Sequence, residues 1–195
     1  MRTAWGYEVE TLSPLLSLGD FNTMTGGAYS SNPRTESALK AASQAVRNYC
    51  GWHICPSLQC KAYPVGGGKV LKLPAGYVSA ISAVLEDGET LGGSNYEWRR
   101  DGLMRRTQFK CWSCRWDAIE VTYTAGYDIT AVPDLAEVIR AITEGVLAVS
   151  AGVTSESADG VSISYSANYS SIAAALTSSQ KAALAAYKVV SSHAA

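Results

Sequence analysis

The residues whose types and spacing could support chemistry are the five cysteines and two histidines of the chain. Cys111 and Cys114 form a C-x-x-C pair, which with His53 and the other cysteines could be drawn as a zinc site. A strong zinc pattern would contain a second C-x-x-C at finger spacing, but the other cysteines lie five residues apart (Cys50, Cys55 and Cys60). A redox pair would require a helix N-terminus, which Trp112 and its neighbours do not predict. We therefore interpret the cysteines as unpaired structural thiols of a reducing cytosol, with no metal bound.

No catalytic or cofactor-binding pattern is complete. A Ser-His-Asp triad would have to use His53, because His193 lies in the last three residues, and no nucleophile-elbow pattern is present. The run Gly66-Gly67-Gly68-Lys69 is followed by Val70 rather than by the Ser or Thr of a phosphate-binding loop, and no helix pattern follows it. The chain is therefore expected not to be an enzyme and to need no cofactor.

One stretch of the chain, from residue 98 to residue 116, is basic and rich in aromatic residues. The only acids between residues 97 and 116 are Glu97 and Asp101. The candidate contact residues of the stretch are five arginines: Arg99, Arg100, Arg105, Arg106 and Arg115, accompanied by Lys110, Trp98, Trp112 and Trp116. Such residues suit a solvated hairpin, a contact with DNA phosphates that ignores sequence, or docking to an acidic protein surface.

The composition excludes several other classes of protein. The 195 residues carry a formal net charge of −1, so the chain is neither polybasic nor strongly acidic, and 47% hydrophobic residues exclude intrinsic disorder. The N-terminus lacks the apolar run of a signal peptide, and the most apolar stretch, 138–153, is interrupted by Arg140 and Glu144, so no membrane span is expected. Charged residues make up only 17%, which indicates surface covered by a partner.

The elements that must position these residues are a set of helices and one inserted sheet. Helices are predicted at about 33–50, 134–150 and 178–190, with a short helix from Ser17 to about Met24, and Asn32-Pro33 and the Thr177–Gln180 capping box should begin two of them. Strands are predicted at 69–73, 78–86 and 119–124, with hairpin turns at Asp87-Gly88 and at 100–102. The expected helical core is Leu39, Val46, Leu135, Val138, Ile139, Ile142, Leu184 and Tyr187.

The C-terminal quarter of the chain is unusually poor in charge. From Ser150 to Ala195 only four side chains carry a formal charge: Glu156, Asp159, Lys181 and Lys188. Residues 161–165 alternate like a strand whose outer face is polar. A soluble Ser/Ala tail and an assembly surface are equally compatible with this composition.

The order of several short motifs resembles that of a known family. The motifs are residues 45–54 (AVRNYCGWHI), Leu73-Pro74, 96–98 (YEW), 101–106 (DGLMRR), 119–128 (IEVTYTAGYD), 132–135 (VPDL), 152–157 (GVTSES) and 161–166 (VSISYS). In this order they are similar to the head-to-tail adaptor, or connector, proteins of long-tailed bacteriophages. The resemblance covers roughly residues 12–190.

The resemblance implies an α+β fold, a small helical bundle with an inserted antiparallel sheet and an extended C-terminal arm plus helix. It implies one adaptor domain over 1–195, with N-terminal helices at 1–56, the sheet at 57–125, a helix at 126–150, and the arm and last helix at 151–195. It further implies a structural virion protein of the neck, assembled in the host cytoplasm. Such a protein forms a ring, usually of twelve copies, beneath the portal, and extends the DNA channel.

The resemblance also implies the partners and the surfaces that meet them. The partners would be further copies of the chain, the portal protein, the next connector (a stopper) or a tail terminator protein, and double-stranded DNA in passing, with no membrane. The portal and subunit interface candidates are Val153, Thr154, Ser155, Glu156, Val161, Ile163, Tyr165, Tyr169 and Tyr187.

For the basic stretch, docking to a ring neighbour is favoured, because a DNA channel should not hold its cargo tightly. The alternative function is a DNA-binding module that uses residues 98–116 without sequence specificity and would bind heparin or DNA with a steep salt dependence. A zinc-stabilised or redox protein would instead contain metal and unfold with a chelator.

Overall fold

The computed structural model describes residues 3–148, 155–158, 161–164 and 176–189. The chain forms two compact units. The strand unit consists of Met1–Leu12, Cys50–Ala131 and Tyr187–Ala195, and the helix unit consists of Ser13–Tyr49 and Val132–Ala186. The mixed α+β class predicted from the sequence is confirmed, and the assignment of all residues to a single adaptor domain stays a prediction.

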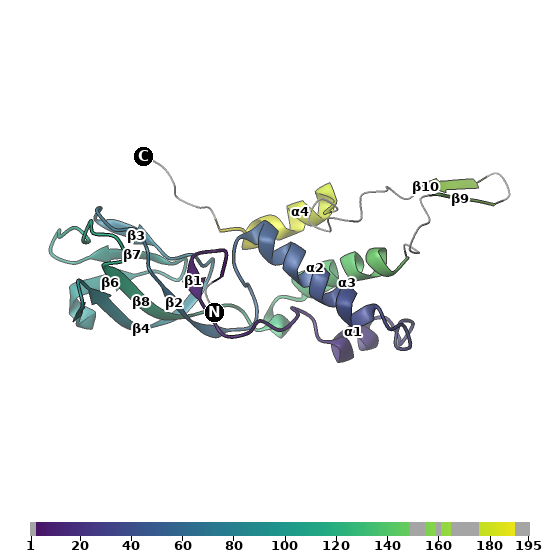
Figure 1. The fold of residues 1–195 in the computed structure, drawn as a ribbon, viewed down its shortest axis with the longest axis horizontal. Helices are drawn as coiled ribbons and strands as arrows, with labels where there is room; N and C mark the ends of the chain where they lie inside the picture. Colours follow the sequence, from purple (N-terminus) through teal and green to yellow (C-terminus); the bar gives the residue numbers. More distant parts are fainter. Residues whose placement is uncertain (1–2, 149–154, 159–160, 165–175, 190–195) are drawn as a thin grey trace. The chain divides into compact units, whose positions relative to one another are not determined.

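The strand unit contains a five-stranded antiparallel sheet in the order β1-β2-β8-β4-β5 (Figure 1). Its strands are β1 (Tyr7–Glu8), β2 (Leu58–Ala62), β4 (Val78–Glu86), β5 (Glu89–Thr90) and β8 (Ile119–Ala125). Every second residue of the central strand β8 is buried, as its alternating sequence predicts. Asp87 and Gly88 both have positive φ, at 51° and 84°, which is the turn geometry that an Asp-Gly pair favours in a two-residue hairpin.

A second antiparallel sheet in the same unit has three strands in the order β3-β7-β6. These are β3 (Val70–Lys72), β6 (Tyr96–Trp98, after the short 3-10 helix η1, Gly93–Asn95) and β7 (Leu103–Arg106). The sequence predicted a single sheet, and this prediction is wrong. The turn at residues 74–76 separates β3 from β4, so β3 pairs with β7 instead of extending the larger sheet. The backbone N–H of Val78, the first residue of β4, donates to the carbonyl of Arg100, in the turn between β6 and β7, at 2.7 Å, and this bond links the two sheets.

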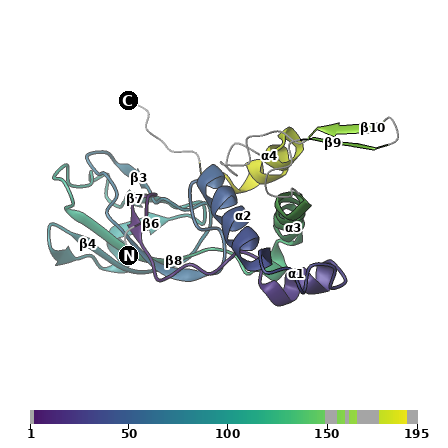
Figure 2. The same ribbon diagram turned by 45° about the vertical axis from the view of Figure 1, so that its right-hand side comes forward.

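The helix unit contains α1 (Leu18–Met24), α2 (Thr35–Cys50, whose last residue begins the strand unit), α3 (Pro133–Ala148) and α4 (Ser178–Leu184). Two single 3-10 turns, η2 (Ile129–Ala131) and η4 (Ala185–Tyr187), precede α3 and follow α4. Ser17 and Thr177 cap α1 and α4 as predicted, and Thr177 forms the complete capping box with Gln180. Helix α2 begins two residues later than predicted, and Asn32 accepts the backbone N–H of Arg34 at 2.9 Å just before it. Figure 2 shows α4 beside α3, in agreement with Figure 1.

Six of the eight predicted core residues are buried: Leu39, Val46, Leu135, Ile139, Ile142 and Leu184. Val138 and Tyr187 are only half-buried, so these two predictions are wrong. The buried stripe of α3 runs through positions 135, 139 and 142, and Val138 lies at its rim. Tyr187 follows the end of α4 and belongs to the strand unit.

The strand β10 (Val161–Ser164) covers most of the predicted 161–165 strand, and its partner β9 (Ser155–Ala158) was not predicted. The two strands pair antiparallel, with Val161 opposite Ala158 and Ser164 opposite Ser155. The short strands β1 and β2 were also missed by the sequence analysis, since two to five residues give too little alternation to recognise.

Candidate assembly surfaces

Three of the five arginines in the basic stretch form exposed ion pairs. Arg99 lies 3.0 Å from Asp101, and Arg105 contacts Glu97 through both Nε, at 2.7 Å, and Nη2, at 2.6 Å. Of these two acids, Asp101 lies within the stretch and Glu97 directly precedes it in sequence. Arg115 forms the third pair, 3.0 Å from a carboxylate oxygen of Asp87.

Arg106 is a structural residue, because it is buried beside Glu86 and Trp112. The Nε of Arg106 lies 3.5 Å from Glu86, with 10% and 12% of the two side chains exposed, and its guanidinium carbon lies 5.5 Å from the centre of the Trp112 ring. Glu86 also accepts the backbone N–H of Ser113 at 2.7 Å. A charge held in this way cannot reach a flat external partner such as a DNA backbone.

Glu86 and Asp87 come from the β4–β5 hairpin, outside the stretch in sequence, so counting local acids missed them. Arg100 is exposed, and among the described residues it has no ion pair. The basic stretch is therefore much closer to neutral than its sequence indicates, which weakens it as a DNA footprint.

The cysteines divide into two groups. Cys50, Cys55 and Cys60 are buried, whereas Cys111 and Cys114 are exposed, and none forms a disulfide. Burial raises the pKa of both Cys50 and Cys60 to about 12, against a smaller opposite effect of the Lys188 charge on Cys50. Over the described ranges, His, Cys, Asp and Glu side chains do not gather in threes as a metal site would need.

His53 is buried, and both of its ring nitrogens are engaged. Nδ1 lies 2.9 Å from the hydroxyl of Tyr7, and Nε2 lies 3.0 Å from the carbonyl oxygen of Ala125. The Tyr7 hydroxyl also accepts the backbone N–H of His53 at 2.9 Å. His53 thus fastens β1 to the unit rather than facing a substrate. The other histidine, His193, lies outside the described residues.

The structure describes five of the nine portal and subunit interface candidates. Ser155, Glu156, Val161 and Ile163 lie together in the β9–β10 hairpin, where Glu156 is opposite Ile163. Tyr187 lies in the strand unit, where the centre of its ring is 6.0 Å from that of Tyr127 in an edge-to-face arrangement. Its backbone carbonyl accepts a hydrogen bond from Trp52 Nε1 at 2.7 Å. The remaining candidates lie outside the described residues: Val153, Thr154, Tyr165 and Tyr169.

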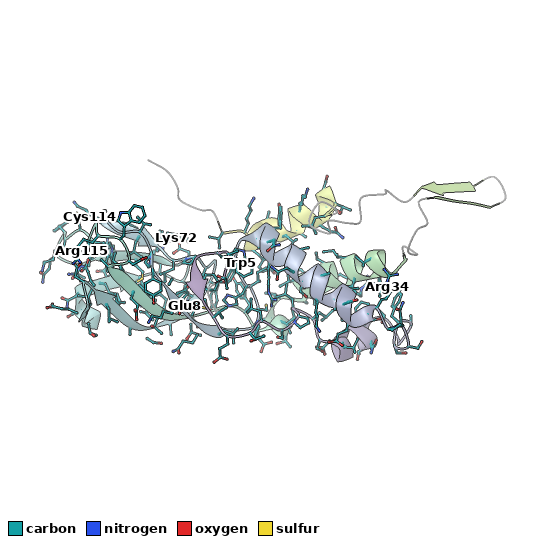
Figure 3. The ribbon with its side chains drawn as sticks, in the orientation of Figure 1. Trp5, Glu8, Arg34, Lys72, Cys114 and Arg115 are labelled. Atoms are coloured by element: carbon teal, nitrogen blue, oxygen red, sulfur yellow. The ribbon has the colours of Figure 1, made fainter. Side chains whose placement is uncertain are left out.

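Besides Trp98, four large apolar side chains of the strand unit are exposed, and the sequence analysis had named only Trp116 among these four as part of a possible contact surface. Val65, Phe109 and Trp116 are almost fully exposed, and Val70 is about half exposed. The sequence feature that could have indicated this exposure is an aromatic residue, such as Phe109, in a segment that has neither helical nor strand periodicity. Figure 3 shows Cys114 and Arg115, neighbours of Trp116, at one end of this unit, away from Trp5 and Glu8.

Comparisons with known proteins give a fold but no family. No family model and no curated protein sequence matches the chain. The fold is similar to a chain in the neck of the empty GTA (gene transfer agent) particle, computed with C6 symmetry. That match has a TM-score of 0.59 and 16% identity, and covers 94% of this chain and 95% of the other.

A second solved structure gives the same result. It is the neck of the native GTA particle, computed with C12 symmetry, with a TM-score of 0.60 and 14% identity over 94% of this chain and 95% of that chain. The chain therefore has the fold of a protein found in the neck of phage-like particles. None of the helices in the described part of the chain is long and apolar enough to cross a membrane.

Proposed function

We propose that this chain is a non-enzymatic structural protein of a phage-like neck, where it forms a ring that joins the DNA-filled head to the tail. The observation that carries the proposal is the match in fold over nearly the whole length of both chains, including both the helices and the sheets.

Twelve copies is the stoichiometry that we propose for the ring. The two similar necks were computed with C12 and C6 symmetry. C12 symmetry relates twelve equivalent subunits, and C6 symmetry accommodates twelve subunits as six equivalent pairs. Rings use heterologous contacts, in which one face of a subunit meets a different face of the next. The low charged fraction of the chain, 17%, agrees with a molecule that covers two such faces.

The proposed partners follow the position of a ring between head and tail. The portal protein would contact one side, through the C-terminal segment that contains the β9–β10 hairpin, and a stopper or tail terminator protein would contact the other. Double-stranded DNA would pass through the channel without tight binding. Assembly would take place in the host cytoplasm.

The experiment that tests this function removes the chain from the particle. A phage-like element in which the gene is deleted should accumulate DNA-filled heads and free tails, and expression of the intact chain should restore joined particles. Electron microscopy and a count of joined particles give the result. A deletion that leaves joined particles at their normal yield would contradict the proposed function.

A further inference from the structure

The β9–β10 hairpin forms a two-stranded sheet of its own (Figure 1). Within the described part of the chain, no third strand pairs with either of its edges. A hairpin of only two strands is marginally stable in water, and it takes a third strand or a packed face to make such a sheet stable. The hairpin is therefore an incomplete sheet that a strand from another chain can complete.

The two edges of this hairpin are the longest open strand edges in the described residues. The outer strands of the five-stranded sheet, β1 and β5, have two residues each, and those of the three-stranded sheet, β3 and β6, have three each. β9 and β10 have four residues each. Proteins usually block edge pairing with very short edge strands, proline or lysine. The segment 155–164 contains no proline and no lysine, so nothing of this kind blocks its edges.

The backbone groups that face outward from the hairpin follow from its register. Two residues with the sequence Asp-Gly lie between the strands, and this pair favours a two-residue hairpin turn. In such a hairpin the first pair, Ala158 and Val161, exchanges hydrogen bonds inside the hairpin, and the bonding direction alternates from pair to pair. The outward N–H and C=O groups of both edges thus belong to four serines: Ser155 and Ser157 on β9, and Ser162 and Ser164 on β10.

The two edges are complementary to each other, because they have equal length and run in opposite directions. When the hairpins of successive copies stand side by side in a ring, β10 of one copy lies beside β9 of the next, and the two strands are antiparallel. At equal heights Ser162 then lies opposite Ser157 of the neighbouring copy. Together with the pair formed by Ser164 and the neighbour's Ser155, this gives about four backbone hydrogen bonds per contact.

The closure of such a sheet fits a ring of twelve copies. Twelve hairpins supply twenty-four strands about 4.8 Å apart, which gives a circumference of about 115 Å and a diameter of about 37 Å. Closed sheets of about 16–18 strands already enclose an aqueous channel, so this sheet would leave a wide lumen. Positions 155, 157, 162 and 164 share one face of the hairpin. With this serine face inward, the channel has no charge that would hold DNA.

We propose that the β9–β10 hairpins of neighbouring copies pair edge to edge, β10 of one copy with β9 of the next, into one closed antiparallel sheet. This inference rests on the ring proposed above and names a contact that closes it. The addition of a strand to an open edge is a general mode of recognition in which backbone hydrogen bonds supply the affinity. Because the pairing uses only the edges, the faces of the sheet stay available to the portal protein.

Cross-linking between two different single-cysteine strands tests the pairing in the full chain. Ser157→Cys places a thiol on β9 and Ser162→Cys places one on β10, in chains whose exposed thiols are removed by Cys111→Ser and Cys114→Ser. A bifunctional thiol reagent with a reach of about 7 Å tolerates a register shift of two residues.

Rings formed from an equal mixture of the two variants, with or without portal protein, should contain about half of their chains as cross-linked dimers, since one neighbouring pair in four has the right thiols in the right order. Either variant alone should give no dimers, because equivalent positions of neighbouring copies lie two strands, about 10 Å, apart.

A proline variant gives a second, independent measurement. Ser162→Pro removes an outward N–H of β10 and leaves the bonds inside the hairpin intact, because an edge strand accepts proline where the N–H faces away from the ladder. Ser162→Ala is the matched control, since it keeps this N–H. The chain concentration at which half of the rings dissociate, measured by native mass spectrometry, should rise by about tenfold or more with proline and stay unchanged with alanine.

The outcomes separate this inference from the proposed function. Rings of normal size that give no dimers in the mixture, or equally many dimers from a single variant, would overturn edge pairing and leave the ring standing. A Ser162→Pro variant that forms rings as readily as Ser162→Ala but fails to join heads to tails would also overturn it, by assigning the edge to the portal or a tail protein. A wild-type chain that stays monomeric even with portal would overturn the proposed function itself.

Discussion

The ion pairs of the basic stretch allow its affinity for DNA to be predicted quantitatively. Arg99, Arg105 and Arg115 are each held by an exposed acid, so the wild-type stretch offers only Arg100 and Lys110 to phosphates. Two phosphate contacts predict a slope of log Kobs against log salt of about −1.8, since each contributes about −0.9 on duplex DNA. The triple change Asp87→Asn, Glu97→Gln and Asp101→Asn releases the three arginines. Asn suits the positive φ of position 87, so the hairpin should survive.

The three released arginines should add about −2.7 to the slope, which is an additional loss of about 40-fold in affinity between 50 and 200 mM salt. Fluorescence anisotropy with a random-sequence duplex measures both slopes. The control triple, Glu10→Gln, Glu89→Gln and Asp117→Asn, changes the net charge equally at exposed acids for which no ion pair is present among the described residues. The reasoning is refuted if the wild type already has the steep slope, or if the control gains as much as the test variant.

Three further predictions concern stability. Tyr7→Phe removes the hydroxyl that bonds the backbone N–H and Nδ1 of His53. It should therefore lower the free energy of unfolding, measured in urea, by about 2–4 kcal/mol. The control Tyr96→Phe should change this free energy by less than about 0.5 kcal/mol. Gly66→Ala drives a β-carbon into the backbone of Ser113 and should lower the free energy of unfolding by about 1–3 kcal/mol, measured by thermal unfolding. Gly93→Ala, with open space around it, should lower it by less than about 1 kcal/mol, and equal losses would be evidence against the close packing of Gly66 on Ser113. Burial raises the pKa of the Cys60 thiol in the folded chain to about 12, from the usual 9.0, so between these pH values only the unfolded chain loses this proton. The free energy of unfolding should therefore fall from pH 9 to 12, and Cys60→Ala should make that fall shallower. A variant with the same pH profile as the wild type would contradict the burial effect.

The sequence was sufficient to predict those features that depend only on residues close together in the chain. The β4–β5 hairpin was predicted because Asp87-Gly88 and the flanking alternation lie within one short segment. The caps of α1 and α4 were predicted for the same reason, since Ser17 and Thr177 bond residues only three positions away.

Contacts between distant residues explain most of what the sequence could not predict. β1 has only two residues and exists through its pairing with β2 and the Tyr7–His53 contact, 46 positions apart. Arg115 and Asp87 are 28 positions apart, so the neutralisation of the basic stretch was invisible to a count of neighbouring charges. The exposure of Phe109 was equally hidden, because composition does not show which aromatic residue the backbone turns outward.

The most direct test of the central claim is the native mass of the purified chain, alone and mixed with portal protein. A closed assembly of twelve copies of the 20.7 kDa chain, about 250 kDa, in either sample is the expected result. A chain that remains a 20.7 kDa monomer in both samples would contradict the account.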